Sequence, residues 1–304
     1  MNRLDVVGFG ALNVDKLFKV NRIAAAEEES FVTEYTESCG GSAANTIVGL
    51  ARLGCKTGFI GKVANDTEGK MLLEDFRKEG VDTNSITVAK HDRSGKVMGF
   101  VDEKGNRALY ADPGVNDDIA PSEIDGRYIS QTKFLHLTSF VGQKSFMTQI
   151  KMLETLPENV KVSFDPGALY ARLGLARLDP IVRRTFVMMP NVGELEALTG
   201  KADYKQSAES LFKKGVEIVA VKLGSKGCYV TDGKQSHLIK ALKVKVVDTT
   251  GAGDAFNAGF LYGLVEGKDI SECGKIGNFV ASRCITRMGA RTGLPRLDEL
   301  KGTN

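Results

Sequence analysis

The sequence has no tryptophan, only three histidines, and five cysteines that stand far apart. No two cysteines form a CxxC pair or another close spacing typical of a metal site. An odd, scattered set is typical of reduced thiols, so we expect a cytoplasmic protein. The cysteines are Cys39, Cys55, Cys228, Cys273 and Cys284.

An excess of charge of one sign is also missing. The 41 basic and 38 acidic residues leave a net charge of +3, and neither sign forms a long run. A surface dedicated to nucleic acid or to a membrane usually needs such an excess, so we expect neither partner. The N-terminal apolar run is interrupted by Asp5, Gly8 and Gly10. It therefore predicts a first strand and a turn, and neither a signal peptide nor a membrane span.

Two common nucleotide-binding motifs are incomplete. The segment from Gly49 to Gly54 is not followed by the Gly-Lys pair of a Walker A loop, and no GxxxxGK[ST] occurs elsewhere. Gly8 and Gly10 follow the first predicted strand, but Asn13 stands where a dinucleotide-binding fingerprint needs its third glycine. These gaps argue against a nicotinamide-dependent oxidoreductase.

The sequence does contain an alternation of short β-branched runs with longer helical patterns, which is typical of parallel βαβ units. We therefore expect a single α/β domain over residues 1–304, with a mostly parallel central sheet flanked by helices. The predicted strands are Leu4–Gly8, Thr57–Val63, Lys133–Leu137, Lys161–Asp165, Thr185–Pro190 and Ile218–Leu223. The predicted helices are Ala43–Leu53, Thr67–Glu79, Lys144–Leu156, Val192–Gly200, Tyr204–Lys214, Asp254–Glu266 and Ile270–Arg287.

Two stretches, Lys16–Ser38 and Arg93–Asp112, instead have the period of strands with hairpin turns, one of them at Glu103–Asn106. Short antiparallel strands between βαβ units do not easily join a parallel sheet, so we expect a small β-sheet lid. Ligands of open α/β sheets bind outside the carboxyl ends of the strands, where such a lid excludes water. Its exposed edges offer strands that can pair in a homodimer.

The most informative segment is Asp248–Asp254, DTTGAGD, which follows an alternating stretch at Lys243–Val247 and precedes a helical pattern. Glycines at such a junction turn backbone N–H groups outward at the positive end of the helix dipole, which favours an anion. A carboxylate there repels phosphate, so Asp254 makes sense if it faces a hydroxyl group that loses its proton during phosphoryl transfer. The spacing alone equally allows a helix N-terminal carboxylate without a catalytic role.

A second glycine pair, Gly40 and Gly41, precedes the helix predicted at Ala43–Leu53. Two glycines permit a ligand to approach the backbone closely, and Asn45 offers its amide on the first helical turn. A plain junction between a hairpin and a helix fits the same residues.

The two glycine segments, GGSAANTIVGLARLG from Gly40 and DTTGAGDAFNAGF from Asp248, resemble the signature segments of the ribokinase (PfkB) family of carbohydrate and nucleoside kinases. Further segments agree at Gly10–Asp15, Pro190–Glu194 and Lys222–Gly227, so the resemblance covers nearly the whole chain. It implies a ribokinase-like fold and an ATP-dependent, in-line phosphoryl transfer to a hydroxyl group of a small sugar similar to ribose, fructose or a sugar acid.

The resemblance also implies roles for single residues. Asp254 matches the family's base, and the N–H groups of Gly251, Ala252 and Gly253 match its anion hole, which stabilises the charge on the transferred group. The matches to sugar-binding positions are Asn13, Asp15, Gly40, Gly41 and Asn45. The matches to ATP-binding positions are Asn191, Lys222, Gly224, Gly227 and Asn278. Lys222 replaces a threonine that is common at its position.

Cation sites follow from the same resemblance. Glu194, together with Asn191, matches a pair that holds Mg²⁺ beside the ATP phosphates through water, although, taken alone, the pair is better explained by helix capping with a solvated Glu194. Many family members bind K⁺, and Asp248 and Thr250 match two of its ligand positions. Hard cations prefer such oxygen ligands. The backbone carbonyls of Cys284, Arg287 and Gly289 are further candidates.

Two departures leave the acceptor open. Ser42 stands where ribokinases have a lysine, and Thr138–Gln143 lacks the glutamate that they place after this strand, which weakens the case for free ribose. Phe140 offers a ring that stacks on a base or sugar, unless it is a core residue. Asp165 ends a predicted strand at the ligand face. Arg107, on the predicted lid, is either a contact for an anionic substrate group or a solvated strand residue.

Two other functions fit the same motifs. A nucleoside kinase of the same family is the first, because the motifs do not separate sugars from nucleosides. The second is a non-catalytic sensor of sugars or nucleotides that retains the fold without turnover. The intact Gly251–Asp254 segment and the Asn191–Glu194 pair favour an enzyme over a sensor.

Overall fold

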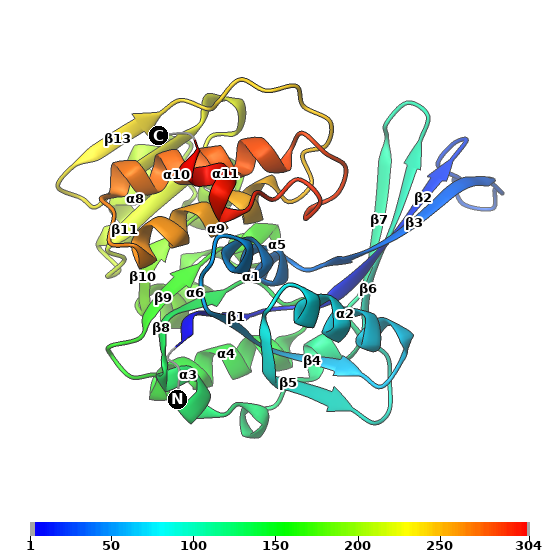
Figure 1. The fold of residues 1–304 in the computed structure, drawn as a ribbon, viewed down its shortest axis with the longest axis horizontal. Coiled ribbons are helices and arrows are strands. Elements are labelled where there is room, and N and C mark those ends of the chain that lie inside the picture. Colours follow the sequence, from blue (N-terminus) through cyan, green and yellow to red (C-terminus); the bar gives the residue numbers. More distant parts are fainter. Residues whose placement is uncertain (1–3, 303–304) are drawn as a thin grey trace.

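The computed structural model describes residues 4–302 and shows a main sheet with helices on both faces (Figure 1). Within these residues nine strands form the main sheet. In spatial order they are β13 (Ser236–Ile239), β12 (Cys228–Thr231), β11 (Ile218–Lys222), β10 (Thr185–Met188), β9 (Lys161–Phe164), β8 (Thr132–Leu137), β1 (Leu4–Phe9), β4 (Thr57–Ala64) and β5 (Asp82–Ala89). All pairs from β11 to β5 are parallel, which confirms the predicted fold class.

Each predicted helix is present, with ends that differ by a few residues. The helices are α1 (Ser42–Arg52), α2 (Thr67–Lys78), α3 (Gly126–Ser130), α4 (Gln143–Thr155), α5 (Gly167–Ala171), α6 (Gly174–Val182), α7 (Val192–Thr199), α8 (Tyr204–Phe212), α9 (Ala252–Val265), α10 (Ile270–Cys284) and α11 (Leu297–Lys301). Short 3-10 turns lie at Gly114–Asp118, Pro121–Glu123 and Gly224–Lys226.

Three details of the prediction were incomplete or wrong. The hairpin of β12 and β13 and the edge strand β5 were missed. The edge strands β5 and β13 are half exposed and carry no continuous apolar run, and β12 is a buried strand of only four residues. Helix α10 ends at Cys284 and not at Arg287, and the carbonyl of Ile285 accepts from the N–H of Val247 at 2.8 Å.

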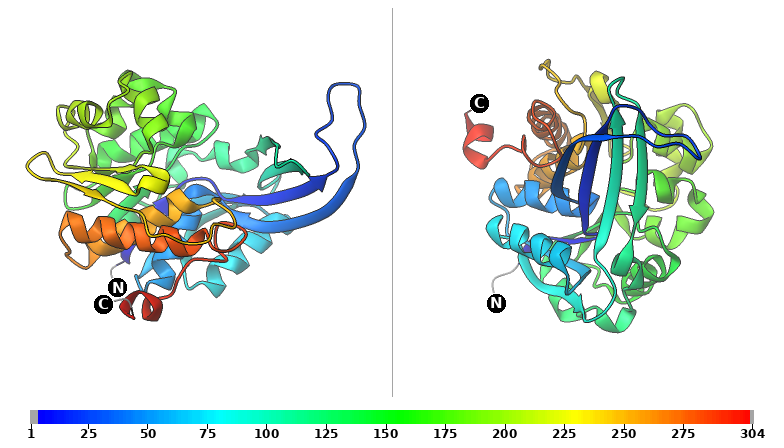
Figure 2. Two further views of the ribbon diagram at one scale, coloured as in Figure 1. Left: turned by 90° about the horizontal axis from the view of Figure 1, so that it is seen from above. Right: turned by 90° about the vertical axis from the view of Figure 1, so that its right-hand side faces the viewer.

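A second sheet extends away from the main body (Figures 1 and 2). We call it the projecting sheet; its strands in order are β3 (Val32–Gly40), β2 (Asn13–Val20), β6 (Gly95–Asp102) and β7 (Arg107–Asp112). They lie in or beside the stretches predicted to form a lid. One pairing differs from the expectation, because β2 and β6 are parallel rather than antiparallel. Both strands follow parallel strands of the main sheet, β1 and β5, and therefore leave it in the same direction.

The core consists of two apolar clusters, one on each face of the main sheet. Val6 belongs to one cluster and its neighbour Val7 to the other, and both side chains are fully buried. Neighbouring strand residues point to opposite faces, so a sheet covered on both sides needs continuous apolar strands. Helices α1, α2, α9 and α10 supply the first cluster, and α4, α6, α7 and α8 the second.

The close packing of α1 on α9 brings the two signature segments together. Gly49 of α1 faces Ala258 of α9, and a Cβ atom on Gly49 would lie only 2.7 Å from the Cβ of Ala258. Small residues at this contact let the two helix starts, at Ser42 and Ala252, reach the same edge of the main sheet.

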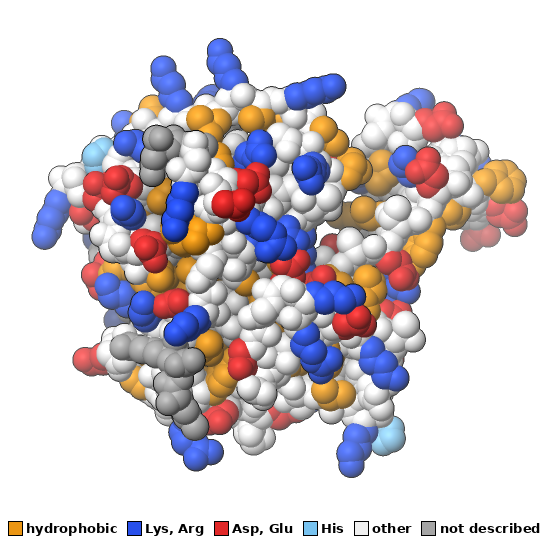
Figure 3. All heavy atoms as spheres, viewed as in Figure 1, with side chains coloured by type: hydrophobic (Ala, Val, Ile, Leu, Met, Phe, Trp, Pro, Cys, Tyr) orange, Lys and Arg blue, Asp and Glu red, His pale blue; other side chains and the backbone are white. Residues whose placement is uncertain are grey.

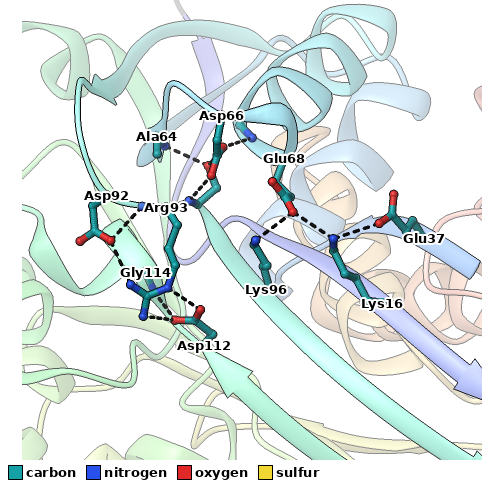
Figure 4. A network of polar contacts seen from close by, with 12 residues as sticks. Lys16, Glu37, Ala64, Asp66, Glu68, Asp92, Arg93, Lys96, Asp112 and Gly114 are labelled. Carbon is teal, nitrogen blue, oxygen red and sulfur yellow. Dashed lines mark hydrogen bonds and ion pairs between the residues drawn. The ribbon is translucent and has the colours of Figure 1, made fainter.

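A polar network joins the projecting sheet to α2 (Figure 4). Glu68, in the first turn of α2, accepts ion pairs from Lys16 of β2 and Lys96 of β6, each at 2.9 Å. The helix cap Asp66 accepts a hydrogen bond from the N–H of Ser94 at 2.8 Å. The base of the projecting sheet is therefore fixed to the main body by charge and by backbone hydrogen bonds.

Within residues 4–302, no helix has both the length and the apolar character required to cross a membrane. The five cysteines are all free thiols.

Candidate active site

The glycine-rich segment forms the turn that starts α9. Gly251 caps the helix with φ 76°, a left-handed conformation that glycine adopts readily. A Cβ atom on Gly251 would lie 2.6 Å from the Cβ of Ala290, so the turn also packs too tightly for a side chain. The N–H of Ala252 already donates to the carbonyl of Thr249 at 3.2 Å. Gly253 is thus the better candidate for an anion contact than Ala252.

Asp254 stands on the first turn of α9 and faces α1. Its Oδ1 accepts a hydrogen bond from Ser42 Oγ and its Oδ2 one from Asn45 Nδ2, both at 2.8 Å. Burial raises the pKa of Asp254 to about 6, and these two hydrogen bonds oppose the rise. The carboxyl group is therefore ionised at neutral pH and has a proton affinity suited to a base.

A buried ion pair lies beside this turn. Lys222 Nζ at the end of β11 is 2.6 Å from Asp165 Oδ2, which also accepts from Asn257 Nδ2 of α9 at 2.6 Å. A Cβ atom on Gly253 would lie 3.4 Å from the same lysine nitrogen. Burial alone would lower the pKa of Lys222, but the charges of Asp165 and Glu194 raise it, so the lysine is charged.

A cavity of about 630 Å³ opens beside the turn and the ion pair. The sequence predicted five ATP-binding residues, and all of them line it: Asn191, Lys222, Gly224, Gly227 and Asn278. Apolar residues form another part of its wall: Ala241, Leu242, Val244, Val246, Phe256, Ala281 and Ile285. Such a mixed lining is typical of a site for an organic ligand with a polar end.

Two of these residues shape the wall through the backbone. Gly227 has φ 99°, and a side chain there would collide with the carbonyl of Ile239. Asn278 donates from Nδ2 to the carbonyls of Ile239 and Lys240, at 3.1 and 3.2 Å. These contacts hold the chain that follows β13 at the edge of the cavity.

Asn191 and Glu194 form a reciprocal cap at the start of α7. Asn191 Oδ1 accepts from the N–H of Glu194 at 2.9 Å, and Glu194 Oε2 accepts from the N–H of Asn191 at 2.8 Å. Both residues also line the cavity, so capping and a contact with a ligand are compatible. Burial and the charge of Asp165 raise the pKa of Glu194.

No group of three or more His, Cys, Asp or Glu among residues 4–302 is arranged to hold a metal ion. The residues near Glu194 nevertheless fit a Mg²⁺ ion that is shared with a triphosphate, since Mg²⁺ usually keeps several waters and takes only one or two carboxylates from the protein. Glu194 supplies a carboxylate to the wall of the cavity that Gly253 also lines.

The segment predicted to hold K⁺ runs along the loop that follows α10. Asp248 Oδ1 accepts from Thr250 Oγ1 at 2.7 Å, and its Oδ2 accepts from the N–H of Gly289 at 2.9 Å. Burial raises the pKa of Asp248, but its hydrogen bonds outweigh burial and hold the pKa below its usual value. The structure thus brings Asp248 and Thr250 together with the loop that carries the carbonyls of Cys284, Arg287 and Gly289.

The residues predicted to bind sugar lie where the projecting sheet meets α1. The Asp15 carboxylate packs on the α-carbon of Gly40, which leaves no room for a side chain at that position. Burial raises the pKa of Asp15 to about 6. Asn13 Oδ1 accepts from Asn116 Nδ2 at 2.9 Å. Gly41 caps α1 with φ 101°.

Sequence reasoning missed Arg291 and Asn257, and of the two roles that it left open for Phe140 the structure confirms the core residue. Phe140 is 2% exposed and its ring packs edge-on against Phe9 at 5.5 Å, so it belongs to the core and stacks on no ligand. Arg291 donates to Asn45 Oδ1 at 2.7 Å. The arginine had no local signal, because its partner lies at the far end of the chain.

Comparison with known proteins agrees with this geometry. Residues 3–297 match the pfkB family carbohydrate kinase. The chain is 52% identical over 252 residues to an uncharacterized sugar kinase of Archaeoglobus fulgidus, covering 82% of this chain and 99% of that protein. It is 33% identical over 288 residues to an ATP-dependent ribose-1-phosphate kinase of Halopiger xanaduensis, covering 94% of each.

Solved structures show the same fold. A ribokinase from Thermotoga maritima superposes with a TM-score of 0.87 at 28% identity and covers 98% of both chains. A ribokinase from Arabidopsis thaliana, complexed with ribose and ATP, gives a TM-score of 0.88 at 24% identity, over 99% of this chain and 98% of that one. From the family match and from the placement of its two signature segments around Asp254, the chain belongs to the pfkB family of carbohydrate kinases.

Proposed function

We propose that this protein transfers the γ-phosphoryl group of ATP to a hydroxyl group of a small sugar, with Asp254 as the base. The observation that carries the proposal is the Asp254 carboxylate, which lies at the wall of the cavity on the glycine turn of α9 and has a pKa of about 6. A base needs a pKa near the working pH and access to the proton that it takes.

The cavity suits ATP in one orientation. Its apolar wall, with the half-exposed Leu242 and Val246, is the part suited to the adenine ring, and Gly224 and Gly227 allow the backbone to approach closely. The triphosphate would then extend toward Gly253 and Lys222. Backbone N–H groups at a helix start and a buried ammonium group both stabilise phosphate charge.

The proposed transfer needs no reactant other than ATP and the acceptor. The acceptor oxygen forms a bond to the γ-phosphorus while the bond from that phosphorus to the β–γ bridging oxygen breaks, and ADP leaves. The hydroxyl proton passes to a carboxylate oxygen of Asp254. Ser42 and Asn45 keep that carboxylate in place throughout the transfer.

Mg²⁺ bound with ATP would neutralise charge on the phosphates and help to align them. Glu194 is the residue that we assign to it, through water, and Asn191 fixes the carboxylate of Glu194 by the helix cap. We assign K⁺, if the enzyme uses it, to Asp248 and Thr250, because both lie beside the glycine turn.

The acceptor would lie between the projecting sheet and α1, next to Asn13, Asp15 and Gly40. A carboxylate accepts two hydroxyl donors, which suits a polyol. In this proposal the projecting sheet acts as a lid over the acceptor. The charge of Arg107 of β7 contributes to the lowered pKa of Asp248, and in this proposal the arginine faces the acceptor. An anionic group on the acceptor would meet this arginine.

The projecting sheet also exposes apolar side chains (Figure 3), among them Leu109 and Tyr110 with 64% and 59% exposure, and Phe31, just before β3, is 72% exposed. We propose that this sheet pairs with its counterpart in a homodimer, because exposed apolar strands otherwise risk unspecific association. Sedimentation of the purified protein at several concentrations tests this.

The proposed reaction is tested by ADP formation from ATP with a panel of acceptors. The panel contains ribose, fructose, a sugar acid, ribose 1-phosphate and two nucleosides, and each is assayed with the wild type and with Asp254→Asn. We expect turnover with a sugar or sugar phosphate, and a loss of roughly two to four orders of magnitude in the variant. Turnover with nucleosides alone would favour a nucleoside kinase, and binding without turnover would indicate a sensor.

A further inference from the structure

Both polar ends of the Asn45 amide are held within the protein. Asn45 Oδ1 accepts from Arg291 Nε at 2.7 Å, and Asn45 Nδ2 donates to Asp254 Oδ2 at 2.8 Å. A guanidinium group has donors only, so Arg291 accepts just one orientation of this amide. In that orientation the NH₂ group of Asn45 points at Asp254.

Arg291 is itself fixed from several sides. Its side chain is 10% exposed and forms an ion pair with Asp75 of α2. Its Nη2 donates to the carbonyl of Gly40 at 3.3 Å. A buried arginine with this many partners has one geometry, and it transmits that geometry to Asn45.

We propose that Arg291 is a positioning residue for the base: it holds the Asn45 amide in the one orientation that donates to Asp254, and thereby sets the position and the charge of that carboxylate. The inference rests on the proposed function of Asp254. It also gives Asn45 a task other than the sugar contact implied by the resemblance, since only one N–H of its amide is left for an acceptor.

Several charged and titratable groups lie around Asp254 and affect its pKa. Asp165, after β9, raises the pKa of Asp254, while Lys222 of β11 lowers it, and the thiol of Cys284 in α10 lies close by. The hydrogen bond from Asn45 is the first of the contributions that lower the pKa. When Arg291 no longer orients Asn45, the pKa of Asp254 should rise, although Asp165 and Lys222 are unchanged.

Two substitutions remove the hydrogen bond between Arg291 and Asn45. Arg291→Met retains length and removes the donors, and Asn45→Leu retains volume and removes the amide. Arg291→Lys keeps one charged donor and should therefore have a smaller effect than Arg291→Met. Arg52→Met is the matched control, because Arg52 is a buried arginine that binds the same loop and Glu79 but does not contact Asn45.

The first measurement is the pH dependence of kcat for each variant. We expect the acidic limb to move up by roughly one pH unit in Arg291→Met and Asn45→Leu, with an activity about fivefold lower at pH 6 and about tenfold lower well below pH 6. Arg52→Met should lower the melting temperature but leave the acidic limb of the pH dependence of kcat in place. An increase in the sugar KM of Asn45→Leu with an unmoved limb would overturn the inference.

The second measurement does not need turnover. Each variant is compared with its own Asp254→Asn partner, and the pH at which their difference in unfolding free energy changes gives the pKa of Asp254. A midpoint that rises in Arg291→Met but not in Arg52→Met supports the inference. An equal midpoint in wild type and Arg291→Met, or an equal shift in both arginine variants, overturns it. An inactive wild type would refute the proposed function, and this comparison would still decide the role of Arg291.

Discussion

Lys222 and Asp165 form an ion pair that lies directly beside the glycine turn, with Nζ 2.6 Å from Oδ2 and both side chains at most 12% exposed. Asn257 of α9 donates to the same carboxylate oxygen. The pair thus joins the ends of β9 and β11 to the helix that carries Asp254. Each charge keeps the other ionised in a site where neither would be stable alone.

Replacement of Lys222 and replacement of Asp165 should have different consequences. Lys222→Met removes the ammonium group from the cavity wall, so we expect kcat to fall about a hundredfold through lost charge stabilisation. Asp165→Asn leaves a buried lysine without its counterion and should cost roughly 3–5 kcal/mol of unfolding free energy. Urea unfolding and steady-state kinetics separate the two effects. Similar stability of wild type and Asp165→Asn would contradict the assignment.

Activity should increase as pH rises through the pKa of Asp254, which is about 6. Only the ionised carboxylate accepts the proton, so kcat should fall tenfold for each pH unit well below 6. Stability changes in the opposite direction. A carboxyl group whose pKa is raised on folding gives stability that is present below its unfolded pKa, near 3.8, and is lost as pH rises through 6.

Asp254→Asn should therefore stabilise the protein at pH 7.5, by on the order of 1–3 kcal/mol, and have little effect near pH 4. Thermal unfolding of wild type and variant across this range checks the sign. Asp15 also has a pKa of about 6 and serves as a comparison, because Asp15→Asn should show the same stability pattern without the same loss of kcat. A variant that is less stable than wild type at pH 7.5 would contradict the burial of Asp254.

Much of this fold could be predicted from local patterns in the sequence. The apolar strands around Val6 and Val7 and the glycine start at Gly251 are visible in the sequence because each depends on neighbouring residues. The direction of β2 against β6 was not visible, since it depends on where two separate strands leave the main sheet. Pairing between distant strands has no local signal.

The same distinction applies to the candidate site. Asp254 and Lys222 lie in recognisable segments, whereas the partner of Asn45 is Arg291, at the other end of the chain. For Phe140 the position after a central strand left a ligand contact and a core residue both open, and the structure places the side chain in the core. Sequence position gives the end of a strand, but packing decides the direction of the side chain.

The ion pairs of Glu68 with Lys16 and Lys96 should contribute to stability and to the placement of the projecting sheet (Figure 4). Hydrogen bonds from the two lysines lower the pKa of Glu68 to about 2. A lowered carboxyl pKa gives stability that is present above the unfolded pKa, near 4.5, and is lost as pH falls through 2.

We expect Glu68→Gln to cost about 1 kcal/mol at pH 7 and less at high salt, because the three side chains are only partly buried. If the projecting sheet acts as a lid, the variant should also raise the KM of the acceptor more than that of ATP. Glu74→Gln is a suitable control, since Glu74 pairs with Lys78 on the same helix at an exposed position. Equal effects of the two substitutions would argue against a joint at Glu68.

Two glycines at the ends of α9 have similar backbone conformations but different surroundings. Substitutions at these two positions therefore distinguish the effect of backbone strain from that of a steric clash. Gly251 at its start has φ 76°, and Gly267 just after its end has φ 70°. Alanine in this left-handed region costs about 1–2 kcal/mol at either position. A side chain at Gly267 meets no described atom within 4 Å, whereas one at Gly251 meets Ala290 at 2.6 Å.

Gly267→Ala should therefore lower the unfolding free energy by about 1 kcal/mol and leave kcat nearly unchanged. Gly251→Ala has to displace either the helix start or the loop at Ala290, which also carries Gly289 and Arg291. We expect it to lower kcat at least tenfold, because small displacements of a catalytic group are costly. Ala290→Gly in the Gly251→Ala background should not restore kcat, because the added Cβ would still lie 2.7 Å from the backbone Cα atom of residue 290. If Gly267→Ala lowered kcat as much as Gly251→Ala does, the loss would come from the strained backbone conformation that both positions share rather than from the contact with Ala290.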